Sequence, residues 1–158
     1  MLLKRYALFL CACLGLLALG RAFAHCQVPC GIYNDDARFV ALAEDITTIE
    51  KALAQIKALA PKQNDPLNAQ QLHRWAEAKD QHADSLAHTL GYYFLQQRIK
   101  APASDADETR YVAQLKAVHG LLVAAMKAKQ GVDAQPVADL RSGLATFQAL
   151  YQAGLEKK

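Results

Sequence analysis

Residues 35–59 read DDARFVALAEDITTIEKALAQIKAL. The apolar side chains of this stretch recur at steps of three and four residues, so they share one face of an α-helix. That face consists of Phe39, Leu42, Ala43, Ile46, Ile49, Leu53 and Ile56. Asp35 and Asp36 suit the positively polarised start of a helix, and Pro61 ends the pattern. The stretch predicts an amphipathic helix whose apolar face must pack against other helices.

Three more stretches of the chain have the same periodicity. They span about residues 67–99, about residues 105–129, and the segment from Gln135 onward. Their predicted apolar faces include Leu72 and Trp75 in the first, Met126 in the second and Tyr151 in the third. Pro102 and Gly131 separate them, and no stretch has the alternating pattern of a β-strand. Four amphipathic helices with short connections predict an all-α protein, an up-down-up-down four-helix bundle over residues 34–158. Such a bundle supports many functions, so the chemistry must come from a particular site.

Residues 1–24 have the pattern of a secretory signal peptide. Lys4 and Arg5 precede an apolar run, and small residues ending at Ala24 follow it. The run, about 15 residues long, is shorter than the ~20 residues that span a bilayer. We expect cleavage after Ala24, export to the periplasm or the extracellular space, and no stable membrane anchor.

Cleavage would change the charge and the cysteine count. The chain of 158 residues is 53% hydrophobic and 21% charged, which allows one packed domain and makes global disorder unexpected. Its net charge of +3 reflects 18 basic and 15 acidic residues. Loss of Lys4, Arg5 and Arg21 would leave 15 of each sign, so composition does not favour a nucleic-acid partner. Of four cysteines, Cys26 and Cys30 would remain.

The new N-terminus would offer a compact set of metal ligands. His25 would supply its α-amine and an imidazole, Cys26 a thiolate and a deprotonated backbone nitrogen, and Cys30 a second thiolate. Pro29 and Gly31 favour a tight turn that returns Cys30 to the same centre. Two nitrogens and two sulfurs in a plane suit Ni(II) or Cu(II) better than tetrahedral zinc, with the imidazole left as an axial ligand. Anionic donors and an axial nitrogen would also stabilise Ni(III).

Two other interpretations of this segment remain open. Cys26 and Cys30 could form a disulfide in an oxidising compartment, which would make the protein a structural or interaction module. The same donors could instead hold copper or nickel for delivery, without enzymatic activity.

The motif His-Cys-x-x-Pro-Cys-Gly-x-Tyr, residues 25–33, resembles the nickel hook of nickel superoxide dismutases. The resemblance implies a hook in front of a four-helix bundle and one nickel ion per subunit, held by His25, Cys26 and Cys30. It also implies that Tyr33 lines the path to the metal, and that superoxide is converted to O2 and hydrogen peroxide by Ni(II)/Ni(III) cycling. Members of the family assemble as homohexamers, so the resemblance implies a homo-oligomer here.

The resemblance is weaker beyond the hook. A branch of the family orients the axial histidine with a glutamate and an arginine, which aligned positions of this chain do not reproduce. Either Glu44 and Lys79 substitute for them, or the backbone or a neighbouring subunit orients the imidazole of His25. Tyr93 matches a family tyrosine that hydrogen-bonds near the hook tyrosine, although a packing role is the alternative. His73, His82, His88 and His119 are predicted to be surface or core residues outside any second metal site.

Overall fold

The computed structural model of the protein describes residues 35–102 and 105–155. The regular elements in these ranges are all helical, and the four predicted helices are present. They are α2 (Asp35–Leu59), α3 (Pro66–His88) with its continuation η2 (Thr89–Arg98), α4 (Asp105–Gln130) and α5 (Gln135–Leu155). A short 3-10 helix, η1 (Ala60–Lys62), follows α2. The all-α bundle is confirmed, whereas the predicted hook, residues 25–33, lies outside the described residues.

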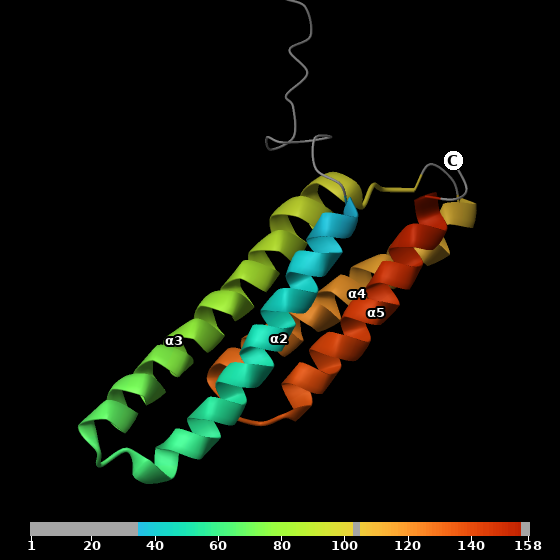
Figure 1. Ribbon diagram of the computed structural model, residues 1–158. Helices are drawn as coiled ribbons and strands as arrows, with labels where there is room; N and C mark the ends of the chain where they lie inside the picture. Colours follow the sequence, from blue (N-terminus) through green and yellow to red (C-terminus); the bar gives the residue numbers. More distant parts are fainter. Residues whose placement is uncertain (1–34, 103–104, 156–158) are drawn as a thin grey trace, which may run out of the picture.

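The four helices run alternately up and down, as an α2–α3 hairpin beside an α4–α5 hairpin (Figure 1). Asp35, the first residue of α2, contacts Tyr93 in η2 and Tyr151 near the end of α5. The start of α2, the end of η2 and the end of α5 therefore meet at one end of the bundle. We call this end, marked by Asp35, Arg98 and Tyr151, the upper end.

The core contains apolar side chains from all four helices. The core residues of α2 are Phe39, Leu42, Ile46, Ile49 and Leu53, each at most 5% exposed. All five belong to the predicted apolar face. Ala43 is exposed and Ile56 only half-buried, so the predicted stripe is too wide and too long. Met126 was also predicted at a core position, which is wrong because it is 49% exposed. Leu121, Ala125 and Ala128 occupy the buried face of α4 in its place.

The α2–α3 hairpin projects beyond the α4–α5 connection (Figure 1). Between Leu53 and Ala83, no hydrophobic side chain is buried. Leu72 and Trp75, both predicted for the apolar face, are half-buried, and Leu67 is exposed. The end of α4 lies beside Lys79, so the earlier turns of α3 have no cover from α4.

Lys79 fixes the end of α4. Its side chain is buried, and its ammonium donates to the carbonyl oxygens of Ala128 at 2.9 Å, Lys129 at 2.7 Å and Gly131 at 3.1 Å. The last carbonyls of a helix have no partners within the helix and carry its negative end charge. One buried cation binds two of these carbonyls and that of Gly131, just beyond the helix, and thereby joins α3 to the α4–α5 connection.

The second helix changes its winding over its last ten residues, Thr89–Arg98, which form a π-helix. The backbone N–H of Ile99 donates to the carbonyl of Phe94 at 2.8 Å, a step of five residues. Residues five apart lie roughly 140° apart around an α-helix, but π-helical winding brings them close to one face. Tyr93 and Arg98 are five apart, and η2 thereby turns both toward the start of α2.

We expect Lys79→Met to lower the free energy of unfolding by about 2 kcal/mol, because buried carbonyls lose their donor. Urea denaturation measures the change. Arg141→Met, which removes an exposed ion pair with Glu50, is the matched control and should have a smaller effect. Equal losses in the two variants would contradict the capping role of Lys79.

Candidate functional site

The predicted metal ligands and the hook tyrosine, His25, Cys26, Cys30 and Tyr33, lie outside the described residues. The structure does describe the point at which their segment joins the bundle. Asp35, the first residue of α2, follows Tyr33 by two positions. Two residues span at most ~7 Å, so the upper end of the bundle is the part of the fold adjacent to the predicted hook.

Asp35 accepts hydrogen bonds from three side chains of two other elements. The Tyr93 hydroxyl donates to Oδ1 at 2.5 Å, and the Tyr151 hydroxyl donates to Oδ2 at 2.8 Å. The Arg98 guanidinium also donates to Oδ2 through Nη2, and through Nε it donates to the Tyr151 hydroxyl at 3.1 Å. We call these four residues the Asp35 cluster. Both carboxylate oxygens are engaged, so the carboxylate cannot rotate without breaking a bond.

The Asp35 cluster is partly shielded from water. The Asp35 side chain is 12% exposed, and that of Arg98 is 29% exposed. Burial alone would raise the pKa of Asp35, but the hydrogen bonds from Arg98, Tyr93 and Tyr151 outweigh it, and the pKa lies below its usual value of 3.8. Burial and the hydrogen bond to Asp35 raise the pKa of Tyr93 and that of Tyr151 to about 12. The carboxylate is therefore ionised and both phenols neutral across the physiological range.

An aromatic layer lies directly below the Asp35 cluster. Phe39, one turn after Asp35 in α2, packs against Phe94 with ring centroids 4.9 Å apart and against Phe147 at 5.5 Å. Phe94 and Phe147 meet edge to face at 5.0 Å, and neither is exposed. The same three elements, α2, η2 and α5, thus contribute to the polar layer and to the apolar layer beneath it.

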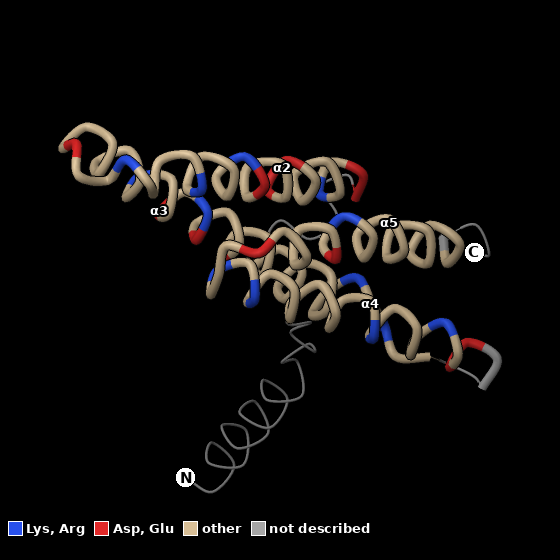
Figure 2. Tube along the Cα trace, turned by 90° about the horizontal axis from the view of Figure 1, so that it is seen from below, with Lys and Arg blue, Asp and Glu red and all other residues tan. Residues whose placement is uncertain are grey.

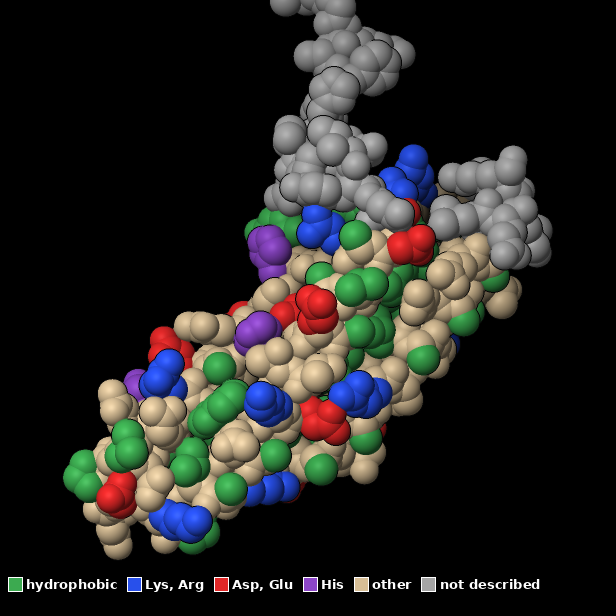
Figure 3. Space-filling model, in the orientation of Figure 1, with side chains coloured by type: hydrophobic (Ala, Val, Ile, Leu, Met, Phe, Trp, Pro, Cys, Tyr) green, Lys and Arg blue, Asp and Glu red, His purple; other side chains and the backbone are tan. Residues whose placement is uncertain are grey.

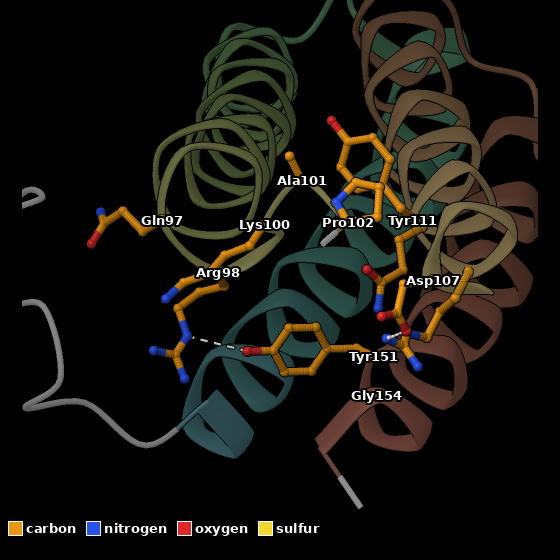
Figure 4. Close-up of a pocket in the computed structure, with 11 residues that line it drawn as sticks. Gln97, Arg98, Lys100, Ala101, Pro102, Asp107, Tyr111, Tyr151 and Gly154 are labelled. Atoms are coloured by element: carbon orange, nitrogen blue, oxygen red, sulfur yellow. Dashed lines mark hydrogen bonds and ion pairs between the residues drawn. The ribbon is translucent and has the colours of Figure 1, made fainter. Parts of the chain in front are cut away.

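Tyr151 also borders a cavity of about 340 Å³ on the α4 side of the cluster. Arg98 and Lys100 reach it from the end of the second helix, and Asp107 and Tyr111 reach it from α4 (Figure 4). The positive charges in its wall are partly compensated, because Arg98 pairs with Asp35 and Arg110 with Asp107. Tyr151 is therefore shared between this cavity and the Asp35 cluster.

Positive groups also surround the Tyr93 ring. The guanidinium carbon of Arg38 lies 5.4 Å from the ring centroid and that of Arg98 lies 5.9 Å away, both within cation–π range. Lys100, two residues beyond Arg98, is exposed. The upper end thus gathers cations from α2 and from the end of the second helix.

Elsewhere the charges are mixed. Basic and acidic residues are both present along the helices (Figure 2), and the face in Figure 3 intersperses hydrophobic side chains with polar ones. None of the helices in the described ranges is long and apolar enough to cross a membrane.

The structure does not bring together Glu44 and Lys79, one of the two predicted alternatives for orienting His25. Glu44 is exposed, and the ammonium of Lys79 is bound to the end of α4. A different acid–base pair joins these helices, because Nδ1 of His82 lies 2.7 Å from Oδ1 of the buried Asp45. The other alternative, orientation by the backbone or a neighbouring subunit, stays a prediction.

The remaining histidines lie at the surface. His88 stacks on Tyr92 with ring centroids 4.3 Å apart, and His73 and His119 are exposed. Within residues 35–102 and 105–155, no three His, Cys, Asp or Glu side chains form a group that could hold a metal ion.

Comparison with known families identifies the class of protein. The model of the family described as nickel-containing superoxide dismutase matches residues 20–154, a range that includes both the hook segment and the helices. The chain therefore belongs to the nickel-containing superoxide dismutase family. No match was found among curated proteins or among solved structures.

Sequence reasoning singled out Tyr93 but missed its partners. Asp35 was interpreted only as a helix-start residue, Tyr151 only as part of an apolar stripe, and Arg98 had no predicted role. One signal was available, since a tyrosine that ends an apolar stripe must place its hydroxyl near a polar partner. The structure connects Tyr93 to Asp35, and its predicted proximity to Tyr33 stays a prediction.

We expect Asp35→Asn to lower the free energy of unfolding by about 2 kcal/mol at neutral pH, because Arg98 loses its anionic partner. The folded state lowers the pKa of Asp35, so its contribution is complete above about pH 4 and is lost as the pH falls through the folded-state value. The difference between wild type and variant, measured by urea denaturation, should shrink as the pH falls below 4. A difference that stays constant with pH would contradict this assignment.

Proposed function

We propose that the protein is an exported nickel superoxide dismutase whose site is the segment His25–Tyr33 at the upper end of the bundle. The observation that carries the proposal is the family match over residues 20–154, which spans the hook motif and the helices together. We further propose that residues 1–24 are removed, that residues 25–33 form the hook, and that residues 34–158 form the bundle.

The donor set of the hook segment fits nickel. His25 would contribute its α-amine and imidazole, Cys26 its backbone nitrogen and thiolate, and Cys30 its thiolate. When bound, nickel supplies a one-electron couple, Ni(II)/Ni(III), that accepts an electron from one superoxide and returns it to another. Two superoxide ions and two protons then give one O2 and one hydrogen peroxide. We propose one nickel ion per subunit and a homohexameric assembly.

The protein's own residues would control access and attraction of the substrate. Tyr33 is proposed to line the path to the metal and to limit what reaches it. Superoxide is a small anion, and Arg38 and Lys100 lie at the upper end of the bundle, the end that the hook segment joins through Asp35. Local cations of this kind favour capture of an anion even where the net charge is near zero.

The proposal predicts a mature chain that begins at His25, binds one equivalent of nickel and dismutates superoxide. Intact-mass measurement of the native protein gives the N-terminus and the bound metal together, and a dismutase assay gives the activity. Cys26→Ser and Cys30→Ser should abolish redox activity. His25→Gln should retain part of the nickel binding and lose most of the turnover, since only its imidazole is removed.

Three results would overturn the proposal. Activity in a chain that retains its leader would exclude the amine ligand. One equivalent of copper without nickel-dependent activity would favour metal delivery. Absence of free thiols in denatured, metal-free protein would favour a Cys26–Cys30 disulfide and a structural role.

A further inference from the structure

We propose that Asp35 is a positioning residue for the metal-binding segment, because it holds the first turn of α2 to the ends of η2 and α5. This inference rests on the proposed function of residues 25–33. It assigns to a residue outside the hook motif a role in fixing where the hook stands relative to the bundle.

The metal-binding segment is tied to Asp35 by covalent connectivity. Cys30 precedes Asp35 by five residues, so any centre that includes the Cys30 thiolate is tied to the Asp35 backbone by at most ~18 Å of chain. The hook segment joins the described bundle at Asp35. A displacement of the first turn of α2 is therefore transmitted directly to the segment in front of it.

The first turn of α2 is fixed by side chains of other elements. Helix starts tend to fray, because their first N–H groups lack partners within the helix. Here Tyr93, Arg98 and Tyr151 hold the side chain of the first helical residue from two other elements. A carboxylate at this position is also favoured by the helix dipole.

Association of the helices does not depend on the Asp35 carboxylate alone. Phe39, Phe94 and Phe147 already pack α2, η2 and α5 together one turn below. The helices therefore remain associated without the carboxylate. What the Asp35 cluster adds is a fixed position and direction for the turn from which the hook segment begins.

The Asp35 cluster is not suited to relay protons. The carboxylate is held in its ionised form, and both phenols that donate to it stay protonated at neutral pH. Groups that do not change protonation near neutral pH act as a rigid support, since an efficient relay needs pKa values near the working pH.

The test compares Asp35→Asn with Val137→Ala in the full mature protein. Val137 is buried at the start of α5, about 21 Å along the helix from Tyr151, so its truncation destabilises the opposite part of the bundle. Nickel dissociation constants are measured by competition with a chelator, under conditions where circular dichroism shows all variants folded. Asp35→Glu, which keeps the charge, serves as the conservative variant.

We expect Asp35→Asn to weaken nickel binding by about tenfold and to lower kcat/KM, with partial recovery in Asp35→Glu. Val137→Ala should keep the wild-type nickel affinity despite its lower stability. Wild-type affinity in Asp35→Asn, or an equal loss in Val137→Ala, would overturn the positioning role while leaving the proposed function intact. Failure of the wild type itself to bind nickel would overturn the proposed function, and this inference with it.

Discussion

The upper end of the bundle depends on one constraint, the compensation of the Asp35 carboxylate. A carboxylate that is 12% exposed must exchange its water for hydrogen bonds and a counter-charge, and the chain supplies both from η2 and α5. The π-helical winding of η2 turns Tyr93 and Arg98 toward this carboxylate. Tyr151, near the end of α5, completes the set of donors.

The Asp35 cluster and the aromatic layer below it act on the same helices by different physics. The rings of Phe39, Phe94 and Phe147 give non-directional burial, which brings α2, η2 and α5 together but tolerates small rotations. The hydrogen bonds of Asp35 are directional and select one of those rotations. An apolar layer for association and a polar layer for orientation therefore sit one turn apart.

The helices and their order could be predicted from the sequence, because each apolar stripe repeats with the period of an α-helix and Pro or Gly separates the stripes. The predicted start and end of the first helix coincide with Asp35 and Leu59. The groups that each buried polar side chain binds could not be predicted. Lys79 could have served a hook or a helix end, and only the position of the α4 carbonyls decides between them. The π-helical winding of η2 also escaped prediction, because an apolar stripe at steps of three and four residues predicts ordinary α-helical winding.

In the candidate site too, one part could be predicted from the sequence and another could not. The predicted ligands of the hook segment follow from a short motif, because all of the donor residues lie close together in the sequence. The Asp35 cluster is assembled from positions 35, 93, 98 and 151, and no local pattern connects them. Met126 illustrates the same limit within a helix, since a correct period does not say how wide the buried face is.

The projecting part of the α2–α3 hairpin has a consequence for how stability is distributed. From residue 54 to residue 82 no hydrophobic side chain is buried, whereas the upper end joins three elements through two layers of contacts. Regions with few buried apolar contacts open at lower free energy than the core. The free energy of local opening therefore rises from the hairpin tip to the upper end. Backbone amides at the tip exchange with solvent through small local openings. Those near Asp35 and Phe94 exchange only when much of the bundle opens, so the hook segment is attached to the more rigid end.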